Sequence, residues 1–380
     1  MGERPLLERV GLSYLRRRSE AMGAIELDDE VHVLDDEEQQ QLVAIERAMV
    51  GRAALFGALS GTVAAVADVL AQPYLDEGAS FLENSTYWLI VGSASVAATI
   101  AEIALLYWDS LRSVHALARA AGVPLFPQGL EEGSSPLATT LTRAALELPN
   151  PPEGPYGIDP YREVSRLQLA VASLIYKLKV SITNLLTKVV LRRLLGRSAL
   201  RVYLEFVGVP VYALWNGFVA FLIVREARLR AIGPSAARVY AEAIFGDTTP
   251  AEDERIAAWS AVAAAVVRTH DVHPNLAAML GELETRFGRV PEARGIDDTG
   301  DFLRQLERLP AQAQGRILAW LHVAAVIDGR VTRAERRLLD QAYGICGRER
   351  DRIATRRLRD LFVSGRAVPP GLFKRLAGHG

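Results

Sequence analysis

The chain has one cysteine, Cys346, in 380 residues. A single cysteine excludes an internal disulfide framework and fits a protein of a reducing compartment. Lysine is also scarce, because Lys177, Lys179, Lys188 and Lys374 are the only four in the sequence and arginine supplies the other basic side chains apart from histidine. This preference for arginine, together with abundant alanine, indicates a bacterial gene of high GC content.

The sequence lacks both a strong net charge and a catalytic motif. Its formal net charge is -1, which excludes the basic balance of a general nucleic-acid-binding protein. It contains no nucleophile elbow, no P-loop and no glycine-rich dinucleotide fingerprint in a parallel-sheet context. The alternating pattern of a β-strand is absent as well. We therefore expect an all-α protein that is not an enzyme and carries no organic cofactor.

Long apolar runs are the most prominent feature that the sequence does contain. The run 87–108 has about the ~20 residues that cross a bilayer, with aromatic pairs at both ends. The run 53–71 is weaker because it includes Asp68 near one end, so we expect it to insert as a hairpin with 87–108. A third run of suitable length is 202–224. These runs predict membrane-crossing helices, and an entirely soluble helical protein is the alternative.

The charges around the first two runs predict their orientation. Arg47 and Arg52 precede the first run, Arg112 and Arg119 follow the second, and the loop between them is acidic. Because arginine and lysine concentrate on the cytoplasmic side, this pattern places the N-terminus in the cytoplasm and the short loop outside. The predicted location is the bacterial inner membrane, with the lipid bilayer as a partner.

A lysine-rich stretch, 166–193, holds three of the four lysines. On a helix, Lys177 and Lys188 fall on one polar face of an otherwise apolar surface. Such a helix either crosses the membrane or lies in its interface. If the helix crosses, the arginines after Lys188 lie outside, against the rule that basic residues stay in the cytoplasm. If it lies in the plane of the membrane, the last span runs outward and the C-terminal part lies outside. The free Cys346 argues against the second outcome, so we predict four crossings.

The predicted fold is an all-α helical membrane bundle of about four spans with a soluble C-terminal helical domain, both termini being cytoplasmic. Gly233 and Pro234 are expected to end the last membrane helix. The predicted organisation is 1–52 N-terminal cytoplasmic helices, 53–108 a transmembrane hairpin, 109–165 cytoplasmic helices with a linker rich in proline and glycine, 166–232 a second membrane helix pair, and 233–380 a cytoplasmic helical domain.

Each predicted span carries a polar seam, by which we mean polar side chains that share one face of an otherwise apolar helix. Ionisable side chains at membrane depth are costly and usually face the interior of a bundle. We expect Lys188 to lie near the level of Asp68 and Glu205, and Lys177 to lie nearer the level of Glu102. The seams are either structural ion pairs or a polar pathway. The candidate intramembrane polar residues are Asp68, Glu102, Lys177, Lys188, Glu205 and Asn216.

Small residues also recur in the first predicted span. Ala53, Gly57, Gly61 and Ala65 stand four positions apart, which places them on one helix face and includes a G-x-x-x-G pattern. Such a face allows a neighbouring helix to approach closely. We therefore expect the first span to pack against another helix through this face.

The C-terminal part contains a distinctive turn between two predicted helices, with Asp328, Gly329, Val331, Thr332 and Glu335. This turn resembles that of the tellurite-resistance TerB-like helical domain, over roughly 235–363. The resemblance implies divalent metal binding by Asp328 and Glu335 and a role in membrane-linked stress systems. The alternative is structural, since Thr332 and Glu335 have the spacing of a helix capping box.

Two histidines, His270 and His273, stand at another helix boundary in the same part of the chain. Their spacing is compatible with metal ligands, but helix capping and surface positions are the favoured interpretation. The sequence as a whole predicts a membrane-anchored, non-enzymatic interaction or sensing protein with a role in envelope stress, whose C-terminal domain binds a protein partner. The alternative is a small transporter or channel-like protein.

Overall fold

The structure is a computed structural model that describes residues 5–23, 31–76, 78–127, 135–150, 155–163, 201–246, 248–288 and 295–378, with only the backbone of 201–207. The lysine-rich stretch, with Lys177 and Lys188, lies outside these residues, as does the side chain of Glu205. The described residues form α-helices, short 3-10 helices, turns and loops, and none of them is in a β-strand. This confirms the all-α fold class.

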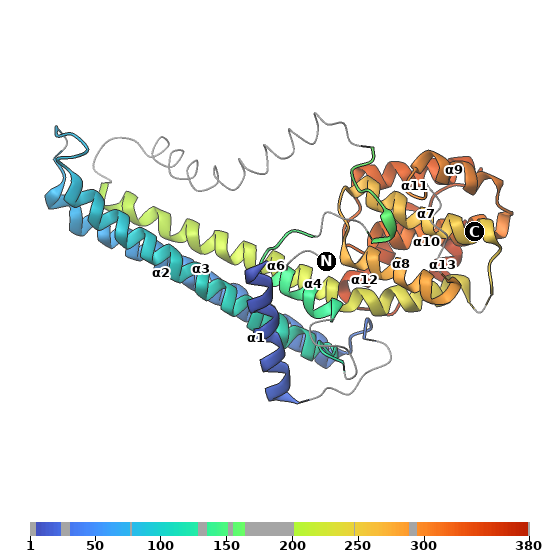
Figure 1. Cartoon of the computed structure of the whole chain (residues 1–380), viewed down its shortest axis with the longest axis horizontal. Helices are drawn as coiled ribbons and strands as arrows, with labels where there is room; N and C mark the ends of the chain where they lie inside the picture. The colour runs from blue at the N-terminus through green and yellow to red at the C-terminus, as the bar shows by residue number, and fades with distance from the viewer. Residues whose placement is uncertain are drawn as a thin grey trace. The chain divides into compact units, whose positions relative to one another are not determined.

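The helices are shown in Figure 1. They are α1 Leu6–Met22, α2 Asp36–Ala71, η1 Gln72–Tyr74, α3 Ser85–Ala120, α4 Pro136–Ala145, η2 Pro155–Gly157, α6 Arg201–Phe245, α7 Glu252–Thr269, α8 Pro274–Phe287, α9 Thr299–Arg308, α10 Ala311–Val326, α11 Arg333–Ile345, α12 Arg352–Ser364 and α13 Pro370–Leu376.

The chain divides into two compact units. Unit 1 is drawn from Met1–Leu42, His115–Glu163 and Glu226–Gly380, and unit 2 from Val43–Val114 and Val164–Arg225. The sequence analysis treats the N-terminal helices, the segment before the lysine-rich stretch and the C-terminal domain as separate parts. In the structure, described residues from all three belong to unit 1.

Unit 1 contains a large core centred on α7 and α10, which pack against each other. Trp259 of α7 and Trp320 of α10 are fully buried in it. Alanine and valine fill most of the remaining buried positions of both helices, and these small side chains let the two backbones approach closely. The other helices of the C-terminal part surround this pair, and Tyr240 and Phe245 at the end of α6 are also buried in the core.

Unit 2 contains the apolar parts of α2, α3 and α6. All three helices are long and apolar enough to cross a membrane, which agrees with the three predicted apolar runs. Gly57 and Gly61 of α2 lie directly against Tyr212 and Val209 of α6. This close approach confirms the predicted small-residue packing face.

The prediction that the last membrane helix ends at Gly233 and Pro234 is wrong, because α6 continues to Phe245. Proline cannot donate a hydrogen bond to the carbonyl four residues earlier and normally interrupts a helix. Here the buried Asn275 side chain donates to the neighbouring carbonyl of Leu229 at 2.9 Å. A Cβ atom at Gly233 would overlap Asn275, so glycine is required where the two meet. Asn275 thus ties this part of α6 to α8, and α6 continues through a sequence that otherwise favours termination.

Substitution of Gly57 tests the α2–α6 packing. A Cβ atom at Gly57 would lie 2.5 Å from the Tyr212 carbonyl oxygen, whereas Gly51 on the same helix has open space around it. We expect Gly57→Ala to lower the free energy of unfolding by about 1–3 kcal/mol through overpacking. The matched Gly51→Ala should leave it unchanged or raise it by roughly 0.5–1 kcal/mol. Reversible unfolding of the full chain in mixed micelles measures both, and equal stabilities would contradict the packing.

Candidate functional site: a buried polar network beside the Asp328 turn

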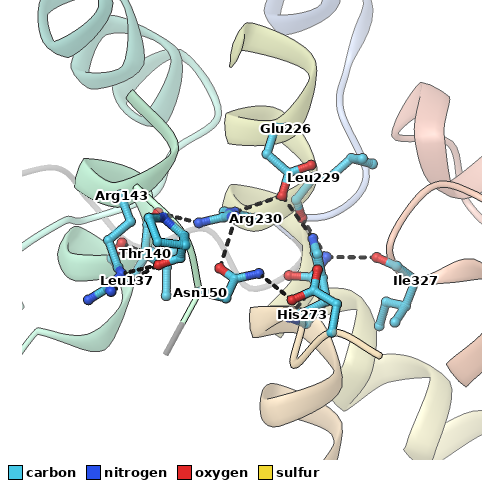
Figure 2. A network of polar contacts seen from close by, with 12 residues as sticks. Leu137, Thr140, Arg143, Asn150, Glu226, Leu229, Arg230, His273 and Ile327 are labelled. Carbon is cyan, nitrogen blue, oxygen red and sulfur yellow. Dashed lines mark hydrogen bonds and ion pairs between the residues drawn. The ribbon is translucent and has the colours of Figure 1, made fainter. Parts of the chain in front are cut away.

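The densest buried polar cluster that we find in the described part of unit 1 surrounds Arg230, which is 6 % exposed. Its Nε atom donates to Glu226 Oε1, one helical turn earlier on α6, at 2.8 Å. Its Nη1 atom donates to the Thr140 carbonyl of α4 at 2.8 Å, and Nη2 donates to Asn150 Oδ1 at 3.2 Å. Figure 2 shows these hydrogen bonds of Arg230. One guanidinium therefore joins α6 to α4 and to the segment that follows it.

His273 forms the second branch of the network. It is the N-cap residue of α8, and its Nδ1 atom accepts a hydrogen bond from the Asn275 backbone N–H at 3.2 Å. An Nδ1 atom that accepts leaves the hydrogen on Nε2, which donates to Glu226 Oε1 at 3.0 Å. Both ring nitrogens are thus engaged, and the capping interpretation is confirmed for His273. It is buried, whereas His270 is an exposed residue that ends α7 in the left-handed conformation.

Asn275 connects this network to the Asp328 turn. Its Nδ2 atom donates to the Leu229 carbonyl and, at 2.7 Å, to the carbonyl of Ile327 at the end of α10. The next residue, Asp328, accepts from the Arg330 N–H at 2.8 Å, and Gly329 takes the positive φ that the turn requires. Asn275 itself is fully buried. The start of the turn is therefore fixed from α8.

The turn ends in a complete capping box. The Thr332 N–H donates to Glu335 Oε2 at 2.7 Å, and the Glu335 N–H donates to Thr332 Oγ1 at 3.1 Å. This confirms the structural interpretation of the Thr332–Glu335 spacing. The box uses one carboxylate oxygen of Glu335 and satisfies two N–H groups at the start of α11.

The second carboxylate oxygen of Glu335 has no such role. Glu335 is 1 % exposed, and its Oε1 atom is buried with no hydrogen-bond partner among the described residues. Burial, and then the negative charge of Asp328, raise the pKa of Glu335 to about 8. A carboxyl group with this pKa is mostly protonated at neutral pH.

Asp328 belongs to the same electrostatic environment. Burial raises its pKa, the backbone hydrogen bond from Arg330 lowers it, and the charge of Glu226 raises it. The two acids of the turn and the Glu226–His273 pair therefore influence one another, and they form one site. Such a site can hold or release a proton at the junction of α6, α8, α10 and α11.

The residues of this site do not fit a divalent metal ion. Calcium requires six to eight oxygen ligands and magnesium requires octahedral coordination. Asp328 and Glu335 supply two carboxylates, each of which already accepts a backbone hydrogen bond. Across the described ranges, no group of three or more histidine, cysteine or acidic residues could hold a metal ion. Metal binding by Asp328 and Glu335 stays a prediction without support from this geometry.

The candidate intramembrane residues whose side chains the structure describes are Asp68, Glu102 and Asn216, and in unit 2 each of them has a hydrogen-bond partner. Asn216 Nδ2 donates to Glu102 Oε1 at 2.5 Å, and the Tyr87 hydroxyl donates to Asp68. Asp68 and Glu102 thus have different partners. The expected pairing with Lys177, Lys188 or Glu205 falls outside the described side chains.

The sequence analysis missed an additional contact of unit 2. Arg52 donates to Asp109 Oδ1 at 2.7 Å and to Ser113 at 3.1 Å, joining α2 to α3. The opposite charges of Arg52 and Asp109 at the matching ends of two predicted spans were the available signal. No protein-family model, curated protein or solved structure matches the chain, so the functional argument depends on the residues themselves.

The raised pKa of Glu335 predicts a pH-dependent stability. Its pKa is about 8 in the folded chain against 4.5 for an ordinary glutamate, so the folded state binds more protons between these values. The free energy of unfolding should therefore fall as pH rises from about 5 to about 8, by on the order of 3 kcal/mol. Glu335→Gln should remove most of this slope and be the more stable protein at pH 8.

Denaturant titrations of the full chain at a series of pH values measure the effect. Asp328→Asn should weaken the slope because it removes the charge that raises the pKa of Glu335. The exposed Glu349 provides the control, since Glu349→Gln should keep the parent slope. A parent protein whose stability is flat over this range would refute the assignment.

The capping box makes a separate prediction about metal. Thr332→Ala should cost about 1 kcal/mol of stability in the presence of a chelator, because it removes the acceptor for the Glu335 N–H. Calcium or magnesium should then leave the unfolding midpoints of the parent and of Asp328→Asn unchanged. A midpoint raised by either ion in the parent, but not in Asp328→Asn, would support the metal site implied by the TerB-like resemblance.

Proposed function

We propose that this is a membrane-anchored, non-enzymatic interaction or sensing protein in which unit 2 is the anchor and unit 1 is the working module. The observation that carries the proposal is the apolar surface of unit 2. In the most apolar 18-residue stretch of α3, no residue is buried against other described residues. Water is a poor environment for such a surface, whereas the acyl chains of a bilayer match it.

Individual side chains support the anchor. Burying one large apolar side chain stabilises a protein by about 1.5–3 kcal/mol, so leaving many of them in water is costly. Trp88 and Trp108 stand toward the two ends of the apolar part of α3, where interfacial aromatic residues are expected. The large apolar side chains that are at least 46 % exposed on the three helices include Leu55, Leu59, Val63, Leu70, Leu89, Val96, Ile100, Ile103, Leu214, Trp215 and Phe218.

The polar residues of unit 2 fit the same proposal. Polar groups inside a bilayer are tolerated when they satisfy one another. Glu102 pairs with Asn216, and Asp68 pairs with Tyr87. Since these side chains hydrogen-bond each other, they support a structural role more than a transport pathway.

The contacts inside unit 1 support a four-crossing topology. Glu8 pairs with Arg143 at 2.5 Å, and Arg230 in the C-terminal part of α6 donates to the Thr140 carbonyl. The segments on either side of the α2–α3 hairpin and the C-terminal part of α6 therefore share one side of any membrane. If α6 crosses the bilayer, its beginning at Arg201 lies on the opposite side. The chain must then cross once more between Glu163 and Arg201. The lysine-rich stretch is the part of the sequence suited to that crossing.

The cytoplasmic face of a bacterial inner membrane is the proposed location of unit 1 and of both termini. Arginines flank the predicted hairpin on the side of unit 1, and the single Cys346 fits a reducing compartment. The TerB-like turn from Asp328 to Glu335 is the basis for proposing an envelope-stress role and a protein partner of unit 1. The proton-binding pair in this turn suits a sensing function.

Cysteine labelling tests the anchor and its topology in a Cys346→Ser background. Single cysteines replace Gly78 in the α2–α3 loop, Gly196 after the lysine-rich stretch, and Ile353 in unit 1. We expect the first two to react with an impermeant maleimide in intact cells, and the third to react only after the inner membrane is opened. The protein should also stay with the membrane during alkaline carbonate extraction.

The outcomes separate the parts of the proposal. Release by carbonate would show that unit 2 is not an anchor. Labelling at position 196 only in opened cells would place the lysine-rich stretch in the cytoplasmic interface and refute four crossings.

A further inference from the structure

A shallow hollow of about 520 Å³ lies on the exposed face of α12 in unit 1. Ile353, Arg356, Arg357 and Asp360 line it from positions three or four apart on the helix, and Arg366 completes it after the turn at Gly365. Ile353 is 73 % exposed. The hollow therefore combines three arginines with an apolar side chain in open contact with water.

The three arginines differ from their neighbours because they have no acidic partner. Arg359 pairs with Asp360 at 2.7 Å, and the paired arginines nearby are Arg352, with Asp340, and Arg375, with Asp351. In contrast, the guanidinium groups of Arg356, Arg357 and Arg366 have no ion pair or hydrogen bond within the described part of the chain. Asp360 is already engaged by Arg359, so the hollow has a net positive charge.

The end of α12 is held by residues that lead into unit 2. The Ser364 carbonyl accepts from the Gln39 side chain at 2.8 Å and from the Arg228 guanidinium at 3.0 Å. Gln39 and Arg228 are each about one helical turn, along the chain, from the residues where unit 2 begins and ends. The hollow thus belongs to the portion of unit 1 that the chain links most directly to the candidate spans.

We propose that this hollow binds the headgroups of anionic phospholipids, an inference that rests on the proposed membrane anchor. Arginine recognises phosphate oxygens by bidentate hydrogen bonds, and unpaired arginines offer all their donors. A basic side chain near an anionic leaflet strengthens association by about fivefold. Ile353 beside the arginines suits the boundary between headgroups and acyl chains. This apolar residue favours a lipid surface over an acidic peptide, which would match the charge alone.

The test uses the full chain in nanodiscs, with Cys346→Ser and an environment-sensitive fluorophore on Ile353→Cys. The discs contain phosphatidylcholine alone or with increasing phosphatidylglycerol. Two further arms add soluble glycerol phosphate or an acidic peptide to neutral discs. We expect phosphatidylglycerol to shift the emission to the blue and to protect the fluorophore from an aqueous quencher, and high salt to reverse both effects.

The charge variants complete the design. Replacing Arg356, Arg357 and Arg366 together by glutamine should weaken the lipid response by more than about tenfold, since each arginine contributes about fivefold. The matched control replaces Arg304, Arg352 and Arg375, which removes the same charge from arginines that already have acidic partners outside the hollow. The control should fold normally, because exposed ion pairs contribute little to stability, and it should keep the response, because its arginines do not line the hollow.

Each contrary outcome has a distinct meaning. A protein that does not incorporate into any disc refutes the anchor and the lipid site with it. Incorporation without a response to phosphatidylglycerol refutes the lipid site alone. Full protection by glycerol phosphate or by the acidic peptide in neutral discs would show that the hollow binds a soluble anion or a protein, and would also overturn the proposal.

Discussion

The side-chain amide of Asn275 is the contact on which the arrangement of unit 1 depends. It is fully buried, it occupies the space that Gly233 leaves open, and it donates to carbonyls of both α6 and α10. Buried amides of this kind specify one arrangement, because any shift of the helices would leave their donors unsatisfied in a low-dielectric interior. Through Asn275 the continuation of α6, the start of α8 and the end of α10 are fixed together.

Around this contact, the site contains one satisfied charge cluster and one unsatisfied acid. Arg230 and His273 both donate to Glu226, so the hydrogen bonds of this cluster offset part of the cost of burying it. Glu335 has one oxygen in the capping box and another without a partner. Within this site, a change in the protonation of Glu335 should therefore have the largest effect on the free energy of folding.

Local features of the sequence were sufficient to predict the helical class, the capping at Thr332 and the close approach at Gly57. Each depends on spacing within a single element, which a sequence displays directly. The continuation of α6 through Pro234 was not predictable in this way, because this part of α6 packs against Asn275, a residue far along the chain. The Arg230 contacts and the joining of three segments in unit 1 could not be predicted for the same reason. Spacing rules apply to residues that are close in the sequence, whereas these contacts join residues that are far apart in the sequence.

The composition of unit 1 from three separated segments has a consequence for biosynthesis. Glu8 is 135 residues from its partner Arg143, and His32 is 203 residues from Ser235. A ribosome releases the N-terminal helices well before the segment that completes their surroundings, and domains form only when their last part has emerged. Under the proposed topology, four helices must enter the bilayer during that interval. Completion of unit 1 then reports that every membrane helix has been inserted in the correct direction, and a chain with one misplaced helix carries its segments on opposite sides, where they cannot join.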